Sequence, residues 1–469
     1  MKKLITTIVI SILLVTFSIE PFYLNITKIG CISSNKGIVA KYNEAYLEKK
    51  DDLLILHVKG SGYEMGYQHG ILLKDHIQHS VQYLIQKMME LGYSYEYMIN
   101  CAKIMVQHIP EEYIDEIKGL ADGACLNYTD TLIAQIDADL QCIEMACSSF
   151  AVFGKATKDG HLYHGRNLDA PLSPQQSGLV IIYEPENGNP FVSVGGFGKV
   201  GVHTGINKNG ISIALMSSLS NDTSINGTPI LILLRKVLQY ASNLADAVHI
   251  INQTRKTTGW NIVLGDGANL NACAAEVSHG YCKVFWAGDS SENIPPHHSI
   301  ENAIRRTNHY ISFELAVTQR SFYDPRKAWN WSWDRYEKLG ELILENYGKI
   351  DAEMAIEFLK TYPIAGWYPT IQSVMFDSTD LELWVANANS TTCAYLREFI
   401  YLSRQDLFPS NKDHQTIFIL ALITLFTSLI LSVIILHRAQ RKNNQFLYLL
   451  ISSQRKSLNI FSYKVSIST

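Results

Sequence analysis

The sequence has few charged residues, no excess of basic residues and no internal repeat. Lys, Arg, Asp and Glu make up 18% of the 469 residues, compared with about 25% in a typical soluble domain. The net charge of -4 leaves no excess of basic residues for binding nucleic acid. No internal repeat is visible, which argues against a solenoid or propeller. We therefore expect a large globular chain with no nucleic-acid partner.

The eight cysteines lack the spacing of a metal site or a redox motif. None forms a CxxC pair or a zinc-ligand set with histidine, so no metal and no cofactor is expected. No obvious Cys-His-Asn set for a conventional cysteine hydrolase is present either. In an exported chain some cysteines can form disulfides. Cys273 and Cys282 are candidates for a pair because both fall on one expected β-ribbon.

The N-terminus carries a short apolar run. Two lysines follow Met1, and residues 4–19 are apolar and almost free of charge. A basic start followed by such a run is typical of a secretory signal. The run is shorter than the about 20 residues of a membrane span, and no clear cleavage site follows it. Residues 1–30 are therefore predicted to be a signal peptide or an uncleaved signal anchor.

A second apolar run lies near the C-terminus. Residues 416–436 contain no charged side chain and are long enough to cross a bilayer as a helix. The tail at 437–469 is basic and contains no Asp or Glu. Because basic segments stay on the cytosolic side of a membrane, the sequence predicts one C-terminal transmembrane helix and a cytosolic tail. The rest of the chain is then extracytoplasmic and held at the cell membrane.

Between these ends, helical and strand patterns alternate. Residues 53–58 predict a strand, and residues 63–140 have helical spacing with a break at Pro110. Later segments contain Asx-Gly turns of the kind found in β-hairpins. Hairpins are expected at 149–166, 179–194, 202–216, 261–277 and 371–385, and helices at 229–253, 325–347 and 351–359. Antiparallel hairpins combined with helical blocks predict an α+β fold rather than a parallel βαβ fold.

One of these hairpins carries a possible catalytic group. A hairpin turning at Asp159 and Gly160 places Cys147 opposite Asp169, with Arg166 nearby. A thiol, a carboxylate and a guanidinium at one end of a sheet suit nucleophilic catalysis, although Cys and Asp also face each other by chance.

A base must activate such a thiol, whose usual pKa is about 8.5. If Cys147 were the first residue of its chain, its own amine, with a pKa of about 8, could accept the thiol proton. Asp169 would orient the amine or the thiol, and Arg166 would keep Asp169 ionised.

Several motifs around this hairpin resemble one known family. The segments CSSFAVFGKAT at 147–157 and HGRNLD at 164–169 are similar to the nucleophile segment of the C45 peptidases. That family includes the acyl-CoA:6-aminopenicillanic acid acyltransferases, within the choloylglycine hydrolase and acid ceramidase group. Further similar segments occur in the same order as in the family: GSGYEMGYQHG at 60–70, EIKGLADGA at 116–124 and RTNHY at 306–310.

The resemblance implies an αββα sandwich of antiparallel sheets, the fold of N-terminal-nucleophile (Ntn) hydrolases. It also implies self-cleavage between Ala146 and Cys147, which divides a helical pro-segment at 50–146 from a catalytic domain at 147–408. The substrate would be a small N-acyl compound such as an amide, a lactam or a lipid amide. By position, Asn308 resembles the asparagine that holds the oxyanion or the amine, and Arg335 resembles a second site arginine. The implied catalytic residues are Cys147, Asp169, Arg166, Asn308 and Arg335.

The sequence departs from the family at two positions. Ala146 precedes the nucleophile where many members have glycine, and Ser217 lies near the position where relatives often have an asparagine. The second oxyanion donor therefore stays open.

Several alternatives also stay open. Hydrolysis and acyl transfer are equally compatible with the sequence, because they differ only in whether water or an amine takes the acyl group. A non-catalytic, membrane-anchored surface binding protein on the same scaffold is the alternative of another class. The cluster Trp329, Trp331 and Trp333 is either core or a substrate wall. Three histidines can also be ordinary core or turn residues: His69, His164 and His309.

Overall fold

A computed structural model describes residues 37–140, 146–172, 178–320 and 328–409, together with short stretches between 423 and 453. The chain divides into two compact units, 1–408 and 409–469. Within the described residues, no helix combines the length and the apolar character that crossing a membrane requires. The expected signal segment at 1–30 lies outside the described residues, as does much of the expected span at 416–436. Both stay predictions.

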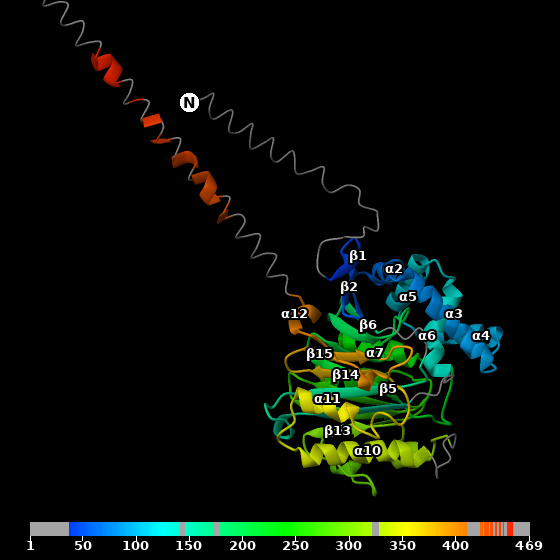
Figure 1. Ribbon diagram of the computed structural model, residues 1–469. Coiled ribbons are helices and arrows are strands. Elements are labelled where there is room, and N and C mark those ends of the chain that lie inside the picture. The colour runs from blue at the N-terminus through cyan, green and yellow to red at the C-terminus, as the bar shows by residue number, and fades with distance from the viewer. Residues whose placement is uncertain are drawn as a thin grey trace, which may run out of the picture. The chain divides into compact units, whose positions relative to one another are not determined.

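Two β-sheets form the centre of the first unit (Figure 1). The ten-stranded sheet runs in the order β1 (Ile38–Tyr42), β2 (Ala45–Lys50), β3 (Leu53–Gly60), β6 (Leu179–Pro185), β7 (Phe191–Gly195), β8 (Thr204–Asn207), β9 (Ile211–Ser217), β10 (Trp260–Asp266), β11 (Asn271–Val277) and β12 (Cys282–Trp286). The six-stranded sheet runs in the order β13 (Ala303–Arg306), β4 (Ala146–Val152), β5 (Tyr163–Asp169), β14 (Thr370–Asp377), β15 (Glu382–Asn387) and β16 (Ile400–Leu402). The paired strands are antiparallel except β3 and β6, so the predicted α+β class is confirmed.

Helices cover the outer face of each sheet. Their bounds are α2 (Gly62–Leu72), α3 (Lys74–Glu90), α4 (Tyr95–Met105), α5 (Glu111–Ala124), α6 (Tyr128–Leu140), α7 (Ile230–Tyr240), α8 (Leu244–Gln253), α9 (Phe313–Ala316), α10 (Ala328–Glu345), α11 (Ala352–Lys360) and α12 (Arg404–Leu407). One core cluster joins α2 to α8 with the ten-stranded sheet. Another joins α10 and α11 with the six-stranded sheet.

The inner faces of the two sheets pack against each other. Ile55 of β3 and Val180 of β6 share a buried apolar cluster with Phe376 of β14 and Leu383 of β15. A strand presents alternate side chains to its two faces, so the same strands also serve the helical layers. The result is four layers, in the order helices, sheet, sheet, helices, as the predicted αββα arrangement requires.

The expected helices and hairpins are found close to their predicted positions. Pro110 begins α5 at its N-cap, and Asn243 caps α8 by accepting from the backbone N–H of Asp246. The sequence did not predict the hairpin of β1 and β2 or the parallel pairing of β3 with β6.

The segments at 60–70 and 116–124, which resemble family motifs, form a pair of helices whose close packing requires glycine. A Cβ atom on Gly66 of α2 would lie 2.0 Å from the carbonyl oxygen of Glu116 on α5. A Cβ on Gly119 of α5 would lie 2.1 Å from the carbonyl oxygen of Tyr63. The two backbones therefore touch, which only residues without a side chain allow. In the structure these two motifs pack α2 against α5.

The predicted register of the nucleophile hairpin is wrong by one residue. Cys147 faces Leu168, and Ala146 faces Asp169. The strands are joined by a long connection that contains a 3₁₀ turn at Gly154–Ala156, not by a tight turn centred on Asp159 and Gly160. A change of one residue exchanges the two faces of a strand.

The proposed pairing of Cys273 with Cys282 is also wrong. Both are free thiols. They lie on neighbouring strands β11 and β12, but Cys273 faces Trp286 and Cys282 faces Val277. The register thus separates the two sulfur atoms.

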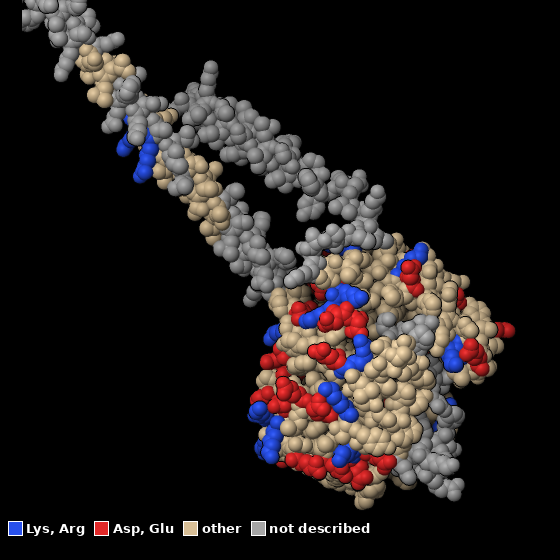
Figure 2. Space-filling model, in the orientation of Figure 1, with Lys and Arg blue, Asp and Glu red and all other residues tan. Residues whose placement is uncertain are grey.

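The surface seen in Figure 2 carries charges of both signs. Lysines and arginines are interspersed with aspartates and glutamates, beside a broad uncharged area. On this face no broad basic surface is seen.

Candidate active site

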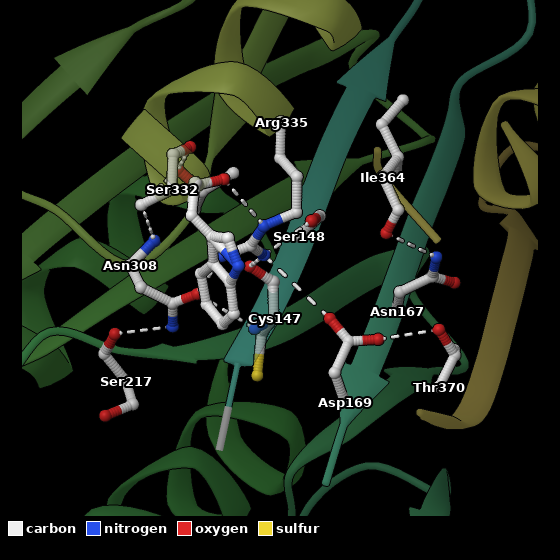
Figure 3. A network of polar contacts seen from close by, with 12 residues as sticks. Cys147, Ser148, Asn167, Asp169, Ser217, Asn308, Ser332, Arg335, Ile364 and Thr370 are labelled. Carbon is white, nitrogen blue, oxygen red and sulfur yellow. Dashed lines mark hydrogen bonds and ion pairs between the residues drawn. The ribbon is translucent and has the colours of Figure 1, made fainter. Parts of the chain in front are cut away.

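Cys147 lies at the start of β4, next to the point where the self-cleavage is expected (Figure 3). Its side chain is 2% exposed and belongs to the apolar cluster between the sheets, with Ala214 and Met216 of β9. The neighbouring Ser148 side chain points to the other face, where it meets Arg335 of α10. The thiol thus faces the ten-stranded sheet, while the polar groups of the outer helix approach from behind.

Asn308 and Arg335 hold the backbone of Cys147. The N–H of Cys147 donates to Oδ1 of Asn308 at 2.9 Å. Arg335 donates to the carbonyl oxygen of Cys147, to Oγ of Ser148 at 2.9 Å and to Oδ1 of Asn308 at 2.7 Å. The side-chain amide of Asn308 in turn donates to the carbonyl oxygen of Ser217 at 2.7 Å. Three elements of the fold therefore determine where the nitrogen of Cys147 lies.

Arg166 is the cation closest to the thiol. Its Nη2 lies 3.5 Å from the sulfur of Cys147, and its other nitrogens donate to Leu215 O at 3.1 Å and to Oγ1 of Thr204 at 2.8 Å. Burial raises the pKa of the Cys147 thiol, and the charges of Arg166 and Arg335 only partly oppose this. The buried thiol is therefore protonated at neutral pH, and its reaction requires a base.

Asp169 faces the outer helix rather than the thiol. Its carboxylate lies 3.9 Å from Arg335 and accepts a hydrogen bond from Oγ1 of Thr370 at 2.7 Å. Burial raises the pKa of Asp169 to about 7, against the opposing effects of Arg335, Thr370 and, least, Arg166. The prediction that Arg166 keeps Asp169 ionised is thus corrected, because residues three apart on β5 lie on opposite faces of the strand and Arg335, not Arg166, lies beside the carboxylate.

All five residues predicted for the site are brought together. Four parts of the chain contribute them: β4 contains Cys147, β5 contains Arg166 and Asp169, the segment after β13 contains Asn308, and α10 contains Arg335. Each of the five contacts at least one of the others. Sequence reasoning missed Thr370, for which no local motif gave a signal. It noted Ser217 for the absence of an asparagine, and here the backbone oxygen of that residue binds Asn308.

The histidines singled out in the sequence are buried. His164 lies between Ser149 and Ser212, with ring nitrogens 3.1 and 2.8 Å from their hydroxyl oxygens. Burial and the nearby Arg166 lower its pKa to about 3, so it is neutral. His69 is buried in α2 and also has a pKa lowered to about 3, by burial and by Arg235.

Trp331 and Trp333 lie in different surroundings. The ring of Trp331 lies against the guanidinium of Arg335 and meets Trp367 edge to face. Together with Asp169 and residues 363–368 they enclose a small space beside the site. Trp333 instead packs among buried aromatic rings, including His309 and Tyr336. The side chain of Trp329 lies outside the described residues.

One cluster in the described part of the chain has the spacing of a metal site. It comprises His161, Asp377 and Asp380, and Nδ1 of His161 already pairs with Asp377 at 2.8 Å. His161 precedes β5, at the opposite end of that strand from Asp169. It therefore takes no part in the cluster around Cys147.

Comparison with solved structures finds weak similarity. A Caenorhabditis elegans N-acylethanolamine-hydrolyzing acid amidase ortholog is 17% identical, with a TM-score of 0.38, covering 50% of this chain and 93% of that one. Penicillin V acylase from Agrobacterium tumefaciens is 14% identical, with a TM-score of 0.37, covering 56% of this chain and 88% of that one.

Comparison with curated proteins finds relatives that are longer than this chain. An uncharacterized protein of Archaeoglobus fulgidus is 29% identical over 70% of this chain, and Protein dcd1B of Dictyostelium discoideum is 25% identical over 51%. The chain spans less than two thirds of these relatives, 63% and 53% of their length.

The model of one protein family matches about half of the chain. Its description is acyl-coenzyme A:6-aminopenicillanic acid acyl-transferase, and the match covers residues 155–391. This range contains Arg166, Asp169, Asn308 and Arg335 and begins shortly after Cys147. By this match the chain belongs to the acyl-coenzyme A:6-aminopenicillanic acid acyl-transferase family.

Proposed function

We propose that this chain is a self-processing enzyme that acts on a small N-acyl amide through a thioester on Cys147. Family membership supports chemistry at a carbon–nitrogen amide bond. The observation that carries the proposal is the set of contacts made to one residue, Cys147. Its nitrogen is bound by Asn308, its carbonyl by Arg335, and its sulfur lies beside Arg166. A structural cysteine requires none of these contacts.

Maturation begins with attack by the thiol on the carbonyl carbon of Ala146. The bond between that carbon and the nitrogen of Cys147 breaks, and the thiol proton ends on the nitrogen. Water then hydrolyses the thioester, which leaves a carboxylate on Ala146 and a free amine on Cys147. Asn308 and Arg335 hold the peptide on both sides of the attacking residue, so the attack needs little reorganisation.

The mature enzyme repeats this chemistry on its substrate. The amine of Cys147 accepts the thiol proton, because an N-terminal amine titrates near neutral pH. The sulfur attacks the acyl carbon, the amine portion of the substrate leaves with a proton, and an acyl thioester remains. Water or an acceptor amine then takes the acyl group. Arg166 stabilises the thiolate, and Asn308 has a second amide hydrogen for the oxyanion.

We further propose an extracytoplasmic location at the cell membrane, by way of the apolar segment 416–436 and the basic tail at 437–469. Such a location favours an amide or lactam as acyl donor over an acyl-CoA, because CoA is cytosolic.

The test is N-terminal sequencing and intact-mass measurement of the purified full chain. We expect a fragment that begins Cys-Ser-Ser-Phe in the wild type and an uncleaved chain in Cys147→Ala. An uncleaved wild-type chain without thiol-dependent amidase activity would instead support the non-catalytic binding protein. A panel of N-acyl amino acids, ceramides, bile amides and β-lactams would then identify the substrate.

A further inference from the structure

Asn308 occupies an unusual position, just past the end of a strand. β13 ends at Arg306, which faces Ser149 on β4. Residues Thr307 to His309 continue alongside Ser148 and Cys147 without backbone pairing to them in the sheet. Buried backbone groups need partners, and here side chains from other elements provide them.

Three side chains make hydrogen bonds to the backbone of this segment. The amide nitrogen of Asn261 donates to the carbonyl oxygens of Thr307 and His309, at 3.0 and 2.8 Å. Oγ of Ser332 accepts from the N–H of Asn308 at 2.9 Å, and Nε2 of Gln319 donates to its carbonyl oxygen at 2.9 Å. The backbone on both sides of Asn308 is therefore held by side chains.

These side chains connect Asn308 to the layers on either side. Asn261 is fully buried in β10 and pairs with Met216 of β9, the neighbour of Ser217. Ser217 is the residue whose carbonyl accepts from the side chain of Asn308. Ser332 lies one helical turn before Arg335 on α10, and Arg335 binds Oδ1 of Asn308. The layer of α10 thus binds the backbone and the side chain of Asn308, and the ten-stranded sheet binds its side chain and the backbone of the residues on either side.

We propose that Asn261 and Ser332 are positioning residues that hold Asn308 against the nitrogen of Cys147. This inference rests on the proposed function. Asn308 contacts the reacting residue through Oδ1 at 2.9 Å, so its usefulness depends on the placement of its backbone. Displacing a group in an active site by about 1 Å can cost about 100-fold in rate. Removing the side-chain bonds of Asn261 or Ser332 should therefore slow self-cleavage markedly while the protein still folds.

The structure offers a matched control for Asn261. Asn207, in β8, is also fully buried, and its amide nitrogen donates to two carbonyl oxygens, of Leu238 and Ala241, at 2.9 and 2.8 Å. Its bonds join β8 to the end of α7 and do not reach the cluster around Cys147. Asn207→Ala and Asn261→Ala thus both remove a pair of amide bonds to carbonyl oxygens, and Asn207→Ala also removes two bonds that Oδ1 accepts from the N–H groups of Asn209 and Ile211.

The experiment is pulse-chase measurement of self-cleavage in the full chain, together with its thermal midpoint. We expect Asn261→Ala to slow cleavage by about 10- to 100-fold, and Asn207→Ala to stay within about twofold of wild type. The midpoint of Asn207→Ala should fall at least as far as that of Asn261→Ala, because Asn207 makes more hydrogen bonds. Equal slowing in both variants would show a purely structural role, and wild-type cleavage in Asn261→Ala would also overturn the proposal.

Ser332 is tested by its conservative variant. Ser332→Ala removes the acceptor for the N–H of Asn308 and should slow cleavage by about 10-fold or more, whereas Ser332→Thr keeps an Oγ atom and should restore most of the rate. In the processed enzyme the Ala variant should lower kcat with little change in KM. A Thr variant as slow as the Ala variant would contradict the role of the hydroxyl. A wild-type chain that is never cleaved refutes the proposed function itself, a distinct result.

Discussion

Two buried arginine–carboxylate pairs in this molecule differ in how fully their partners are engaged. In the helical layer, Arg235 of α7 binds both oxygens of Glu116 at 3.1 and 2.8 Å and lies against the rings of Tyr183 and Phe191. At the candidate active site, Arg335 stays 3.9 Å from Asp169 and gives its hydrogen bonds to Cys147, Ser148 and Asn308. In the first pair the arginine binds its carboxylate directly, whereas in the second it binds Cys147 and the residues around it.

This difference teaches which buried charges serve the fold and which serve chemistry. In the first pair two parallel hydrogen bonds fix the carboxylate, and the other donors of Arg235 bind Gln239 and the carbonyl oxygen of Val200. Asp169, without a direct hydrogen bond from its arginine, has a pKa raised by burial to about 7, where a group can gain and lose a proton under physiological conditions. The comparison yields four predictions, from the largest expected effect to the smallest.

Breaking the pair of Arg235 and Glu116 should have the largest effect on stability. In Arg235→Met, the buried Glu116 loses its partner, and the free energy of unfolding should fall by about 3–5 kcal/mol. Urea unfolding of the full chain measures this. Replacing both residues, as Arg235→Met with Glu116→Leu, should recover much of the loss, and the folded fraction should still cleave itself. Loss of cleavage in folded protein would mean that this pair also serves the site.

Removing Arg335, the arginine of the second pair, should affect the reaction more than the fold. Arg335→Met takes away the bonds to Cys147 and Asn308, so self-cleavage should slow by about 100-fold or more. Its effect on unfolding should be smaller than that of Arg235→Met, because Asp169 lies 3.9 Å from Arg335 and keeps its hydrogen bond from Thr370, whereas Glu116 loses two hydrogen bonds from Arg235. Equal destabilisation by the two variants would erase the distinction between the pairs.

The raised pKa of Asp169 predicts a pH dependence of stability. The folded protein holds a proton on this carboxyl up to about pH 7, whereas the unfolded chain releases it near pH 4. The stabilisation is therefore fully present below about pH 4 and is lost as the pH rises toward 7, with a slope of up to about 1.4 kcal/mol per pH unit.

Asp169→Asn should remove this contribution. The difference in unfolding free energy between wild type and variant, measured from pH 4 to 8, isolates Asp169 from other groups such as Asp139, whose pKa burial also raises to about 7. A difference that does not change with pH would contradict the raised pKa.

The smallest effect is expected at Thr370. Thr370→Val removes one hydrogen bond to Asp169, which should cost about 1 kcal/mol of stability and raise the pKa of the carboxyl further. The pH dependence described for Asp169 should move to higher pH. Thr254→Val, which removes a hydroxyl bond to the carbonyl of Ile250 in α8, should cost similar stability without that movement.

Local patterns in the sequence sufficed for much of the fold. Hairpins with Asx-Gly turns, the helix start at Pro110 and the cap at Asn243 involve residues close together in the chain, so short-range chemistry decides them. The family motifs likewise identified Cys147, Arg166, Asp169, Asn308 and Arg335 as one set. Resemblance rather than periodicity brought the last two into it.

What the tertiary structure alone decided is long-range. The register of β4 and β5 depends on a 3₁₀ turn within their connection, and it places Leu168 rather than Asp169 opposite Cys147. The parallel pairing of β3 with β6 joins strands between which α2 to α6, β4 and β5 lie in the sequence. The support of Asn308 by Asn261 and Ser332 joins three separate elements. Such contacts leave no periodic trace in a sequence, because each depends on packing between segments that meet only in the folded chain.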